Sequence, residues 1–169
     1  KSQSNRVAAI MNTDLQTIPI ESNIRQVAKK MSEFRVSSIF LTDNTEEKEI
    51  LGIITQTDLT RKISASDQLS TKINAKTIMS QLIAVDKNVS IGDAVQIMIK
   101  KGIHHLAVKA DNDKIVGIVS TTDLAKYLKR KLSKYRYRDR ELGEELNIAE
   151  ALSISEPLPY KERNSDEQC

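Results

Sequence analysis

The chain has 169 residues, of which 39% are hydrophobic and 4% aromatic, so it can bury one aliphatic core or two small cores that share an interface. A formal net charge of +3, with charged residues of both signs making up 29%, describes an ordinary surface and does not indicate a polyanion-binding protein. The single cysteine, Cys169, excludes an internal disulfide, and no apolar run approaches the roughly 20 residues that cross a bilayer, so we expect a cytoplasmic protein without a membrane partner.

The first predicted elements are a short strand and a helix. Residues 17–18 form an extended piece that leads to a helix N-cap at Ser22 or Asn23, where a side-chain oxygen can accept an unpaired backbone N–H. Apolar residues then recur at i, i+3, i+4 and i+7 over 24–31. This spacing predicts a helix with one face in the core.

Two further strands and a second helix follow. Segments rich in Ile, Val and Leu predict strands at 38–41 and 49–55, with Asp and Asn turn residues between them. A second helix is expected to start near Asp58, with the hydroxyl of Thr57 as its N-cap.

The second half of the chain repeats the first. The octapeptide GIITQTDL, which starts at Gly52, recurs as GIVSTTDL at Gly117, and the upstream segments AIMN and RVSSIFL correspond to TIMS and GIHHLAV. The second set of predicted elements is an extended piece at 84–85, an N-cap at Ser90, a helix over 91–98, strands at 105–108 and 114–120, and a helix near Asp123 with Thr122 as its N-cap.

These elements predict a β-α-β-β-α unit that occurs twice. A copy of about 60 residues buries too little surface to be stable alone, so we expect two copies packed sheet against sheet in one α/β body. We place the first repeat, with its N-terminal segment, at 1–69 and the second at 70–132. A charged helical extension and a mobile tail are expected at 133–169.

The duplicated octapeptide has two interpretations. A glycine inside a strand indicates that another group approaches closely, and a carboxylate in the first turn of a helix is stabilised by the helix dipole. This structural interpretation leaves a hydroxyl unexplained three residues before each carboxylate, at Thr55 and Ser120. Strand ends beside helix starts are where α/β folds bind small molecules, and a carboxylate suits the paired O–H donors of a ribose.

The doubled pattern G-h-h-[ST]-x-[ST]-D-h, preceded by MN, TIP, RVSSIFL and GIHHLAV, resembles the CBS domain family, named for cystathionine β-synthase, over residues 7–132. The resemblance implies a tandem pair, or Bateman module, with a pseudo-twofold axis and two clefts. It implies a regulatory module that senses AMP, ADP, ATP or S-adenosylmethionine as an effector and requires no cofactor. It also implies a homodimer formed through helices, and no enzyme activity, because in enzymes with such pairs a separate domain does the chemistry.

The resemblance implies the ligand-binding residues as well. In such pairs the hydroxyl and carboxylate of one repeat hold the ribose, and adenine lies against the first strand of the other repeat. The first cleft would combine Thr55, Thr57, Asp58, Leu82 and Ile83 with His104 and the adjacent His105. The second cleft would combine Gln16, Ser37, Ser120, Thr122 and Asp123.

The first cleft is expected to be the better site for a phosphorylated ligand. It has an apolar wall at Ile83 and a possible cation at His104, whereas the second is expected to have a polar wall without a nearby charge. Because neighbouring strand residues point to opposite faces, at most one of His104 and His105 should point into the cleft. No converging set of metal ligands is visible, so no metal is expected.

The basic stretch over 126–140 offers an alternative function. Its Lys and Arg residues alternate with Tyr135 and Tyr137, a pattern typical of nucleic-acid binding. The competing interpretation is a helix with a solvated charged face and a dimer contact, because apolar residues continue a helical stripe into this stretch. The alternative function is therefore a nucleic-acid-associated protein that uses this helix.

Overall fold

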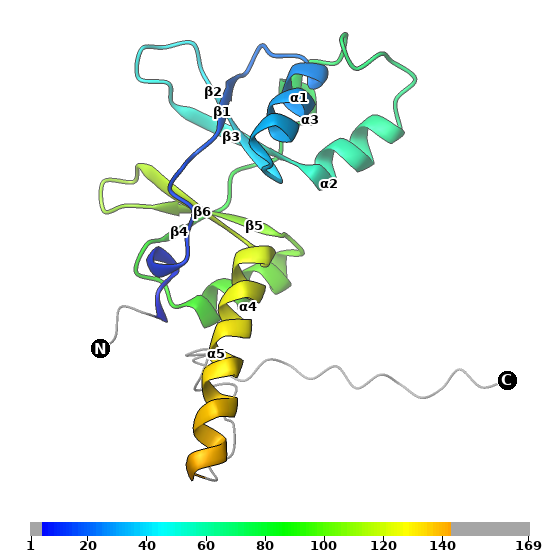
Figure 1. The fold of residues 1–169 in the computed structure, drawn as a ribbon. Coiled ribbons are helices and arrows are strands. Elements are labelled where there is room, and N and C mark those ends of the chain that lie inside the picture. The colour runs from blue at the N-terminus through cyan, green and yellow to red at the C-terminus, as the bar shows by residue number, and fades with distance from the viewer. Residues whose placement is uncertain (1–4, 143–169) are drawn as a thin grey trace, which may run out of the picture.

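The computed structural model describes residues 5–142, with side chains up to residue 134. This part of the chain contains two three-stranded sheets, one from each repeat, that lie one above the other (Figure 1). Each sheet has one parallel and one antiparallel pair of neighbouring strands. The strands are β1 Thr17–Pro19, β2 Ser38–Thr42 and β3 Ile50–Thr55 in the first sheet, and β4 Ala84–Asp86, β5 His105–Lys109 and β6 Ile115–Ser120 in the second.

Helices cover the outer faces of the two sheets (Figure 1). They are α1 Ile24–Phe34, α2 Gln56–Asp58 with a π-helical continuation at Leu59–Ile63, α3 Ala75–Ile78, α4 Ile91–Lys101 and α5 Thr121–Leu142, preceded by a 3-10 turn at Val7–Ala9. The predicted mixed α/β fold with two β-α-β-β-α repeats is confirmed. Asn23 and Ser90 cap α1 and α4 as expected, since each side chain accepts a backbone N–H of the first helical turn.

The segment that leads into each repeat packs into the core of the other repeat. Val7 is fully buried in the cluster built around Val85 and Leu106 of the second repeat. In the opposite direction, Ala75 and Ile78 of α3 lie in the core of the first repeat. Each repeat therefore depends on the other for part of its apolar core.

The duplicated glycines lie under these crossing segments. A Cβ atom at Gly52 would lie 2.3 Å from Sδ of Met79, and one at Gly117 would lie 2.5 Å from Sδ of Met11. The prediction that another group approaches these glycines closely is confirmed, and the group is the methionine of the opposite lead segment.

The two sheets meet through a small apolar cluster. Phe40 and Ile53 of the first sheet are buried together with Ala107 of the second. The expected packing of sheet against sheet is thus present, and it fixes the ends of β3 and β6 beside the opposite repeat. Helix α5 extends well beyond this body, as Figure 1 shows, and confirms the helical interpretation of the basic stretch up to Leu142. The tail predicted beyond it lies outside the described residues.

Candidate functional site

Both repeats contribute to two cavities, and the predicted site residues line them. The first cleft, with a volume of about 200 Å³, is lined by Thr55, Thr57, Asp58, Leu82, Ile83, His104 and His105. The second cleft, with a volume of about 650 Å³, is lined by Gln16, Ser37, Ser120, Thr122 and Asp123. The structure therefore brings together the two sets that the sequence predicted, although the binding of a ligand by them stays a prediction.

Thr55 and Asp58 form a capping box at the end of β3. Asp58 N donates to Thr55 Oγ1 at 3.2 Å, and Thr55 N donates to Asp58 Oδ2 at 2.9 Å. The Thr55 hydroxyl also donates to Oδ2, at 3.1 Å. The hydroxyl three residues before the carboxylate therefore has a structural role, because it accepts the backbone N–H of Asp58 at the start of α2.

Ser120 and Asp123 repeat this arrangement at the end of β6. Ser120 N and Oγ donate to Asp123 Oδ2 at 2.8 and 2.9 Å, and Asp123 N donates to Ser120 Oγ at 3.3 Å. The prediction that Thr57 and Thr122 are the N-caps is wrong. Both helices begin directly after the strands, at Gln56 and Thr121, so the hydroxyls at the strand ends are the ones in position to cap.

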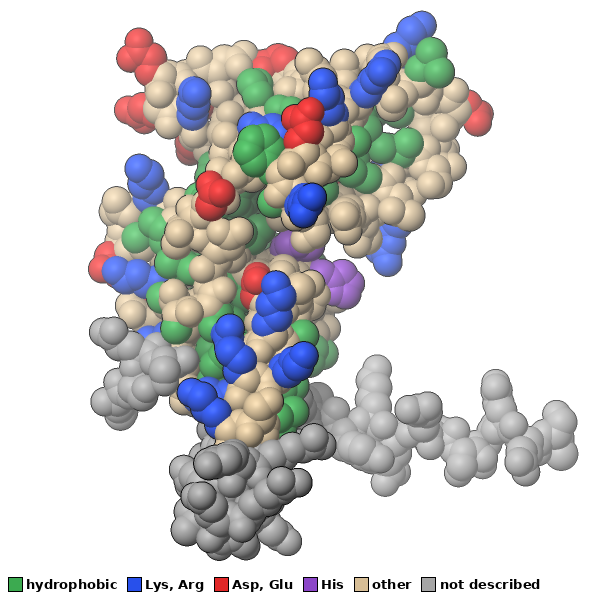
Figure 2. Space-filling model, in the orientation of Figure 1, with side chains coloured by type: hydrophobic (Ala, Val, Ile, Leu, Met, Phe, Trp, Pro, Cys, Tyr) green, Lys and Arg blue, Asp and Glu red, His purple; other side chains and the backbone are tan. Residues whose placement is uncertain are grey.

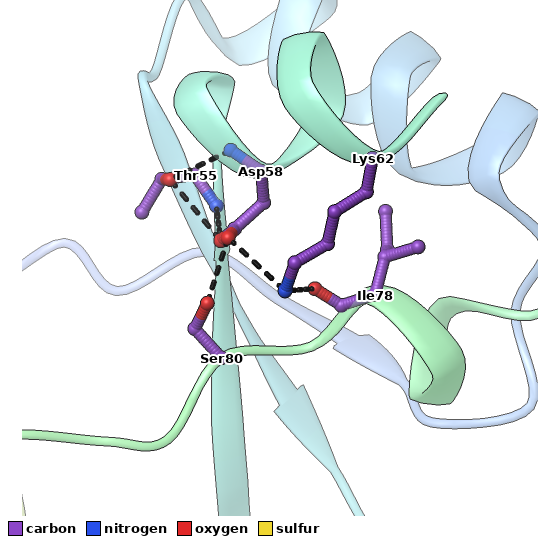
Figure 3. Close-up of polar contacts among 5 residues, drawn as sticks. All are labelled: Thr55, Asp58, Lys62, Ile78 and Ser80. Carbon is purple, nitrogen blue, oxygen red and sulfur yellow. Dashed lines mark hydrogen bonds and ion pairs between the residues drawn. The ribbon is translucent and has the colours of Figure 1, made fainter. Parts of the chain in front are cut away.

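The second carboxylate oxygen of Asp58 is held by the chain itself. Ser80 Oγ donates to Asp58 Oδ1 at 2.7 Å, and Lys62 Nζ lies 3.4 Å from the same oxygen (Figure 3). The ammonium of Lys62 also donates to the carbonyl oxygen of Ile78 at 2.8 Å. These contacts tie the helical segment after β3 to the lead segment of the second repeat, and they leave the Asp58 side chain only 11% exposed.

The two histidines lie at the junction of the repeats, where Figure 2 shows their side chains at the waist of the molecule. His105 lines both clefts, and its Nε2 lies 2.8 Å from Oγ of Ser37. Both His104 and His105 line the first cleft, and His104 directly precedes β5. The expectation that at most one of the two side chains points into this cleft stays a prediction. Burial, and then the nearby His104, lower the pKa of His105, while Asp123 and Asp58 oppose this shift.

The second cleft contains cations that were not predicted. Arg35 and Lys126 both line it, so the expectation of a polar wall without a nearby charge is wrong. Arg61 lines the first cleft. Within the described residues, neither Arg35 nor Lys126 forms an ion pair.

A signal for two of these cations is present in the sequence. Arg61 and Lys126 each follow a duplicated aspartate by three residues, which places them on the same side of the helix, one turn further on. Arg35 ends α1 in the left-handed conformation, with φ 54° and ψ 43°, where the second repeat has Gly102. Its position beside the cleft follows from tertiary packing and has no such local signal.

Part of the positive charge of the basic stretch is engaged within the chain. Lys131 Nζ donates to Oδ1 of Asn5 at 3.2 Å and lies 5.4 Å from the centre of the Tyr127 ring, so one of the cations is engaged within the chain. The remaining described Lys and Arg side chains gather along α5 (Figure 2). Binding of nucleic acid stays a prediction. In the part of the chain that is described, no helix combines the length and the apolar character that crossing a membrane requires.

A family model described as CBS domain matches residues 7–65 and 75–130. An uncharacterized protein of Methanopyrus kandleri is 35% identical over 107 residues, which are 63% of this chain and 53% of that relative. The chain thus spans about half the length of this curated relative.

Solved structures share the fold. A CBS domain protein from Pyrobaculum aerophilum, complexed with AMP, matches with a TM-score of 0.63 at 24% identity, over 70% of this chain and 89% of that one. The CBS domain pair of another protein, in complex with 5′-methylthioadenosine and S-adenosyl-L-methionine, matches with a TM-score of 0.65 at 21% identity, over 75% of this chain and 97% of that one. At these identities the likeness shows the fold.

Proposed function

Since the chain belongs to the CBS domain family, we propose that it is a regulatory module that binds an adenosine-containing ligand between its two repeats. The observation that carries the proposal is the duplicated carboxylate at the edge of a cavity. Asp58 and Asp123 each lie in the first helical turn after a strand of one repeat, and each cavity is completed by residues of the other repeat. Ligand binding would therefore act on the contact between the repeats.

The chemistry of the clefts suits the parts of such a ligand. A carboxylate accepts hydrogen bonds from the two neighbouring hydroxyls of a ribose. Apolar side chains offer a surface for a flat base, with Ile83 in the first cleft and Phe40 in the second. Arg35 and Lys126 are placed to attract a phosphate in the second cleft.

The relatives support the choice of ligand class. One structure with the same fold contains AMP, and another contains S-adenosyl-L-methionine and 5′-methylthioadenosine. These compounds share adenine and a ribose with a free 2′,3′-diol, which are groups that an apolar surface and a carboxylate can bind. The proposal includes AMP, ADP, ATP and S-adenosylmethionine as candidate effectors and assigns no catalytic step to the described residues.

The expected homodimer belongs to the same proposal. A cavity of about 420 Å³ between α4 and α5 is lined by apolar side chains that include Val95, Ile99 and Leu124. Ile99 is 60% exposed in the isolated chain. A second copy that covers this face would remove apolar surface from water and would connect the clefts to the dimer geometry.

Calorimetric titration with AMP, ATP and S-adenosylmethionine tests the proposed function, with GMP as the control for the base. We expect at least one adenosine compound to bind and to raise the melting temperature, because it binds only the folded state. Replacing the aspartate of the occupied cleft, as Asp58→Ala or Asp123→Ala, should weaken binding at least tenfold, since a hydrogen bond to a charged group contributes about 1.5 to 3 kcal/mol. Unchanged affinity in both single variants would reject the proposal.

A further inference from the structure

We infer that the two clefts have different binding capacities: the second cleft, at Asp123, takes the ligand, and the first is closed by the side chains of Lys62 and Ser80. The inference rests on the proposed function, because it takes a ribose-containing anion as the ligand. It concerns the positions around the duplicated aspartates at which the two repeats carry different residues.

In the first cleft both carboxylate oxygens of Asp58 are engaged. Oδ2 accepts the N–H and hydroxyl of Thr55, while Oδ1 accepts the hydroxyl of Ser80 and pairs with Lys62. As Figure 3 shows, Ser80 and Lys62 both converge on the carboxylate. A ribose hydroxyl would have to displace one of them and would exchange one hydrogen bond for another, so it would gain little.

In the second cleft one carboxylate oxygen of Asp123 is left for a ligand. Oδ2 accepts from Ser120 as in the first repeat. Among the residues that the structure describes, no donor or cation contacts Oδ1. Because the capping box uses only Oδ2, a ribose hydroxyl can bind to Oδ1 without breaking a contact that the helix start needs.

Two substitutions between the repeats cause this difference. The position that corresponds to Lys62 is Tyr127, a buried residue whose hydroxyl donates to Asn5 at 2.9 Å. The position that corresponds to Ser80 is Asn12, as the matching β-bridges of Ser80 to Ile53 and of Asn12 to Ile118 show. The side-chain oxygen of Asn12 accepts a backbone N–H of its own loop. Neither residue therefore reaches the carboxylate.

Space and charge favour the same cleft. The cavity at Asp123 measures about 650 Å³ and the one at Asp58 about 200 Å³. Ligand pockets usually fall between roughly 300 and 1,000 Å³. The larger cavity presents two cations, Arg35 and Lys126, that lack ion-pair partners among the described residues, together with the carboxylate of Asp14. The smaller cavity presents one such cation, Arg61, because Lys62 is already paired. A phosphorylated nucleoside therefore finds room, a hydrogen-bond acceptor and cations together at Asp123.

Isothermal titration of the full chain with AMP tests the inference. We expect one AMP per chain, at least tenfold weaker binding in Asp123→Asn, and an affinity within twofold of the unsubstituted protein in Asp58→Asn. The double variant Lys62→Met with Ser80→Ala frees Oδ1 of Asp58 and leaves its capping box intact, so it should add a second binding event, weaker than the first because the cavity at Asp58 is smaller. The control variant Lys72→Met with Ser133→Ala removes a lysine and a hydroxyl elsewhere and should bind a single AMP.

The outcomes separate this inference from the proposed function. Two equal AMP sites in the unsubstituted chain would overturn the inference and leave the proposed function standing. The same holds if Asp58→Asn loses AMP binding while Asp123→Asn binds AMP as the unsubstituted protein does. A double variant that still binds one AMP would also count against closure by Lys62 and Ser80. If AMP, ATP and S-adenosylmethionine all fail to bind the folded protein, both ideas fail. Melting curves of each variant establish that it is folded.

Discussion

Replacing Arg35 by glycine should stabilise the protein and weaken its binding of AMP. Arg35 has φ 54° and ψ 43°, and its N–H bonds to carbonyls of the last turn of α1. Gly102 ends α4 in nearly the same conformation, with φ 62° and ψ 36°. The left-handed region costs a residue with a Cβ about 1 to 2 kcal/mol, whereas glycine adopts it freely. An arginine at this position is therefore strained where the second repeat is relaxed.

The expected gain in stability is smaller than this strain. Glycine increases the conformational freedom of the unfolded chain, which offsets about 0.4 to 1 kcal/mol. The midpoints of the two ranges give a net increase in the free energy of unfolding of about 0.8 kcal/mol for Arg35→Gly, which urea denaturation can measure. Arg35→Ala is the matched control, because it removes the guanidinium but keeps a Cβ in the left-handed conformation, and it should show no such gain.

The same two variants should bind AMP about three- to tenfold more weakly, because a hydrogen bond from a cation to phosphate is lost at a solvent-exposed site. Adenosine, which has no phosphate, should bind equally well to the unsubstituted protein and to both variants. The reasoning is refuted if Arg35→Gly is no more stable than Arg35→Ala, or if the affinities for AMP and adenosine fall together.

Three other changes test different parts of the structure. Gly52→Ala should reduce the free energy of unfolding by about 1 to 3 kcal/mol, because the new Cβ atom meets the side chain of Met79. In urea denaturation, adding Met79→Ala to the same chain should recover part of this loss, and additive effects of the two substitutions would argue against the contact. Burial and His104 lower the pKa of His105, so the folded state favours the neutral ring. The free energy of unfolding should therefore fall as the pH drops below about 6.5, and the melting temperature of His105→Gln should depend less on pH. Ile99→Asp should shift sedimentation from dimer to monomer, and an unchanged sedimentation coefficient would exclude α4 from the interface.

The elements of the fold could be predicted because their signals are local. Apolar periodicity and turn residues predicted the strands to within one residue and the first residues of α1 and α4, although both helices run three residues further than predicted. The N-caps of the helices after β3 and β6 were assigned wrongly because more than one hydroxyl stands near each helix start, and only the position of the strand end decides which of them caps the helix. The expectation for His104 used strand alternation, and the structure places this residue just before β5.

Predicting which residues line each cleft required more than local sequence signals. The pairing of Thr55 and Asp58 with Leu82 and Ile83 was predicted from the family resemblance, because nothing local states which repeat faces which. The contacts of Ser80 and Lys62 with Asp58 depend on how the second lead segment crosses the first repeat. Contacts between distant segments cannot be predicted from periodicity or motif spacing. The contacts of Ser80 and Lys62 are of this kind, and they are what distinguishes the two clefts.

The crossing of the lead segments has a consequence for synthesis on the ribosome. Val7 belongs to a core that includes Val119, so the first described residues have no complete binding partner until β6 has emerged. The first repeat can complete its core earlier, once α3 is available. The nascent chain must therefore keep the segment around Val7 unpaired until β6 has been synthesised, and closure of this long loop is expected to be slow compared with the formation of local contacts.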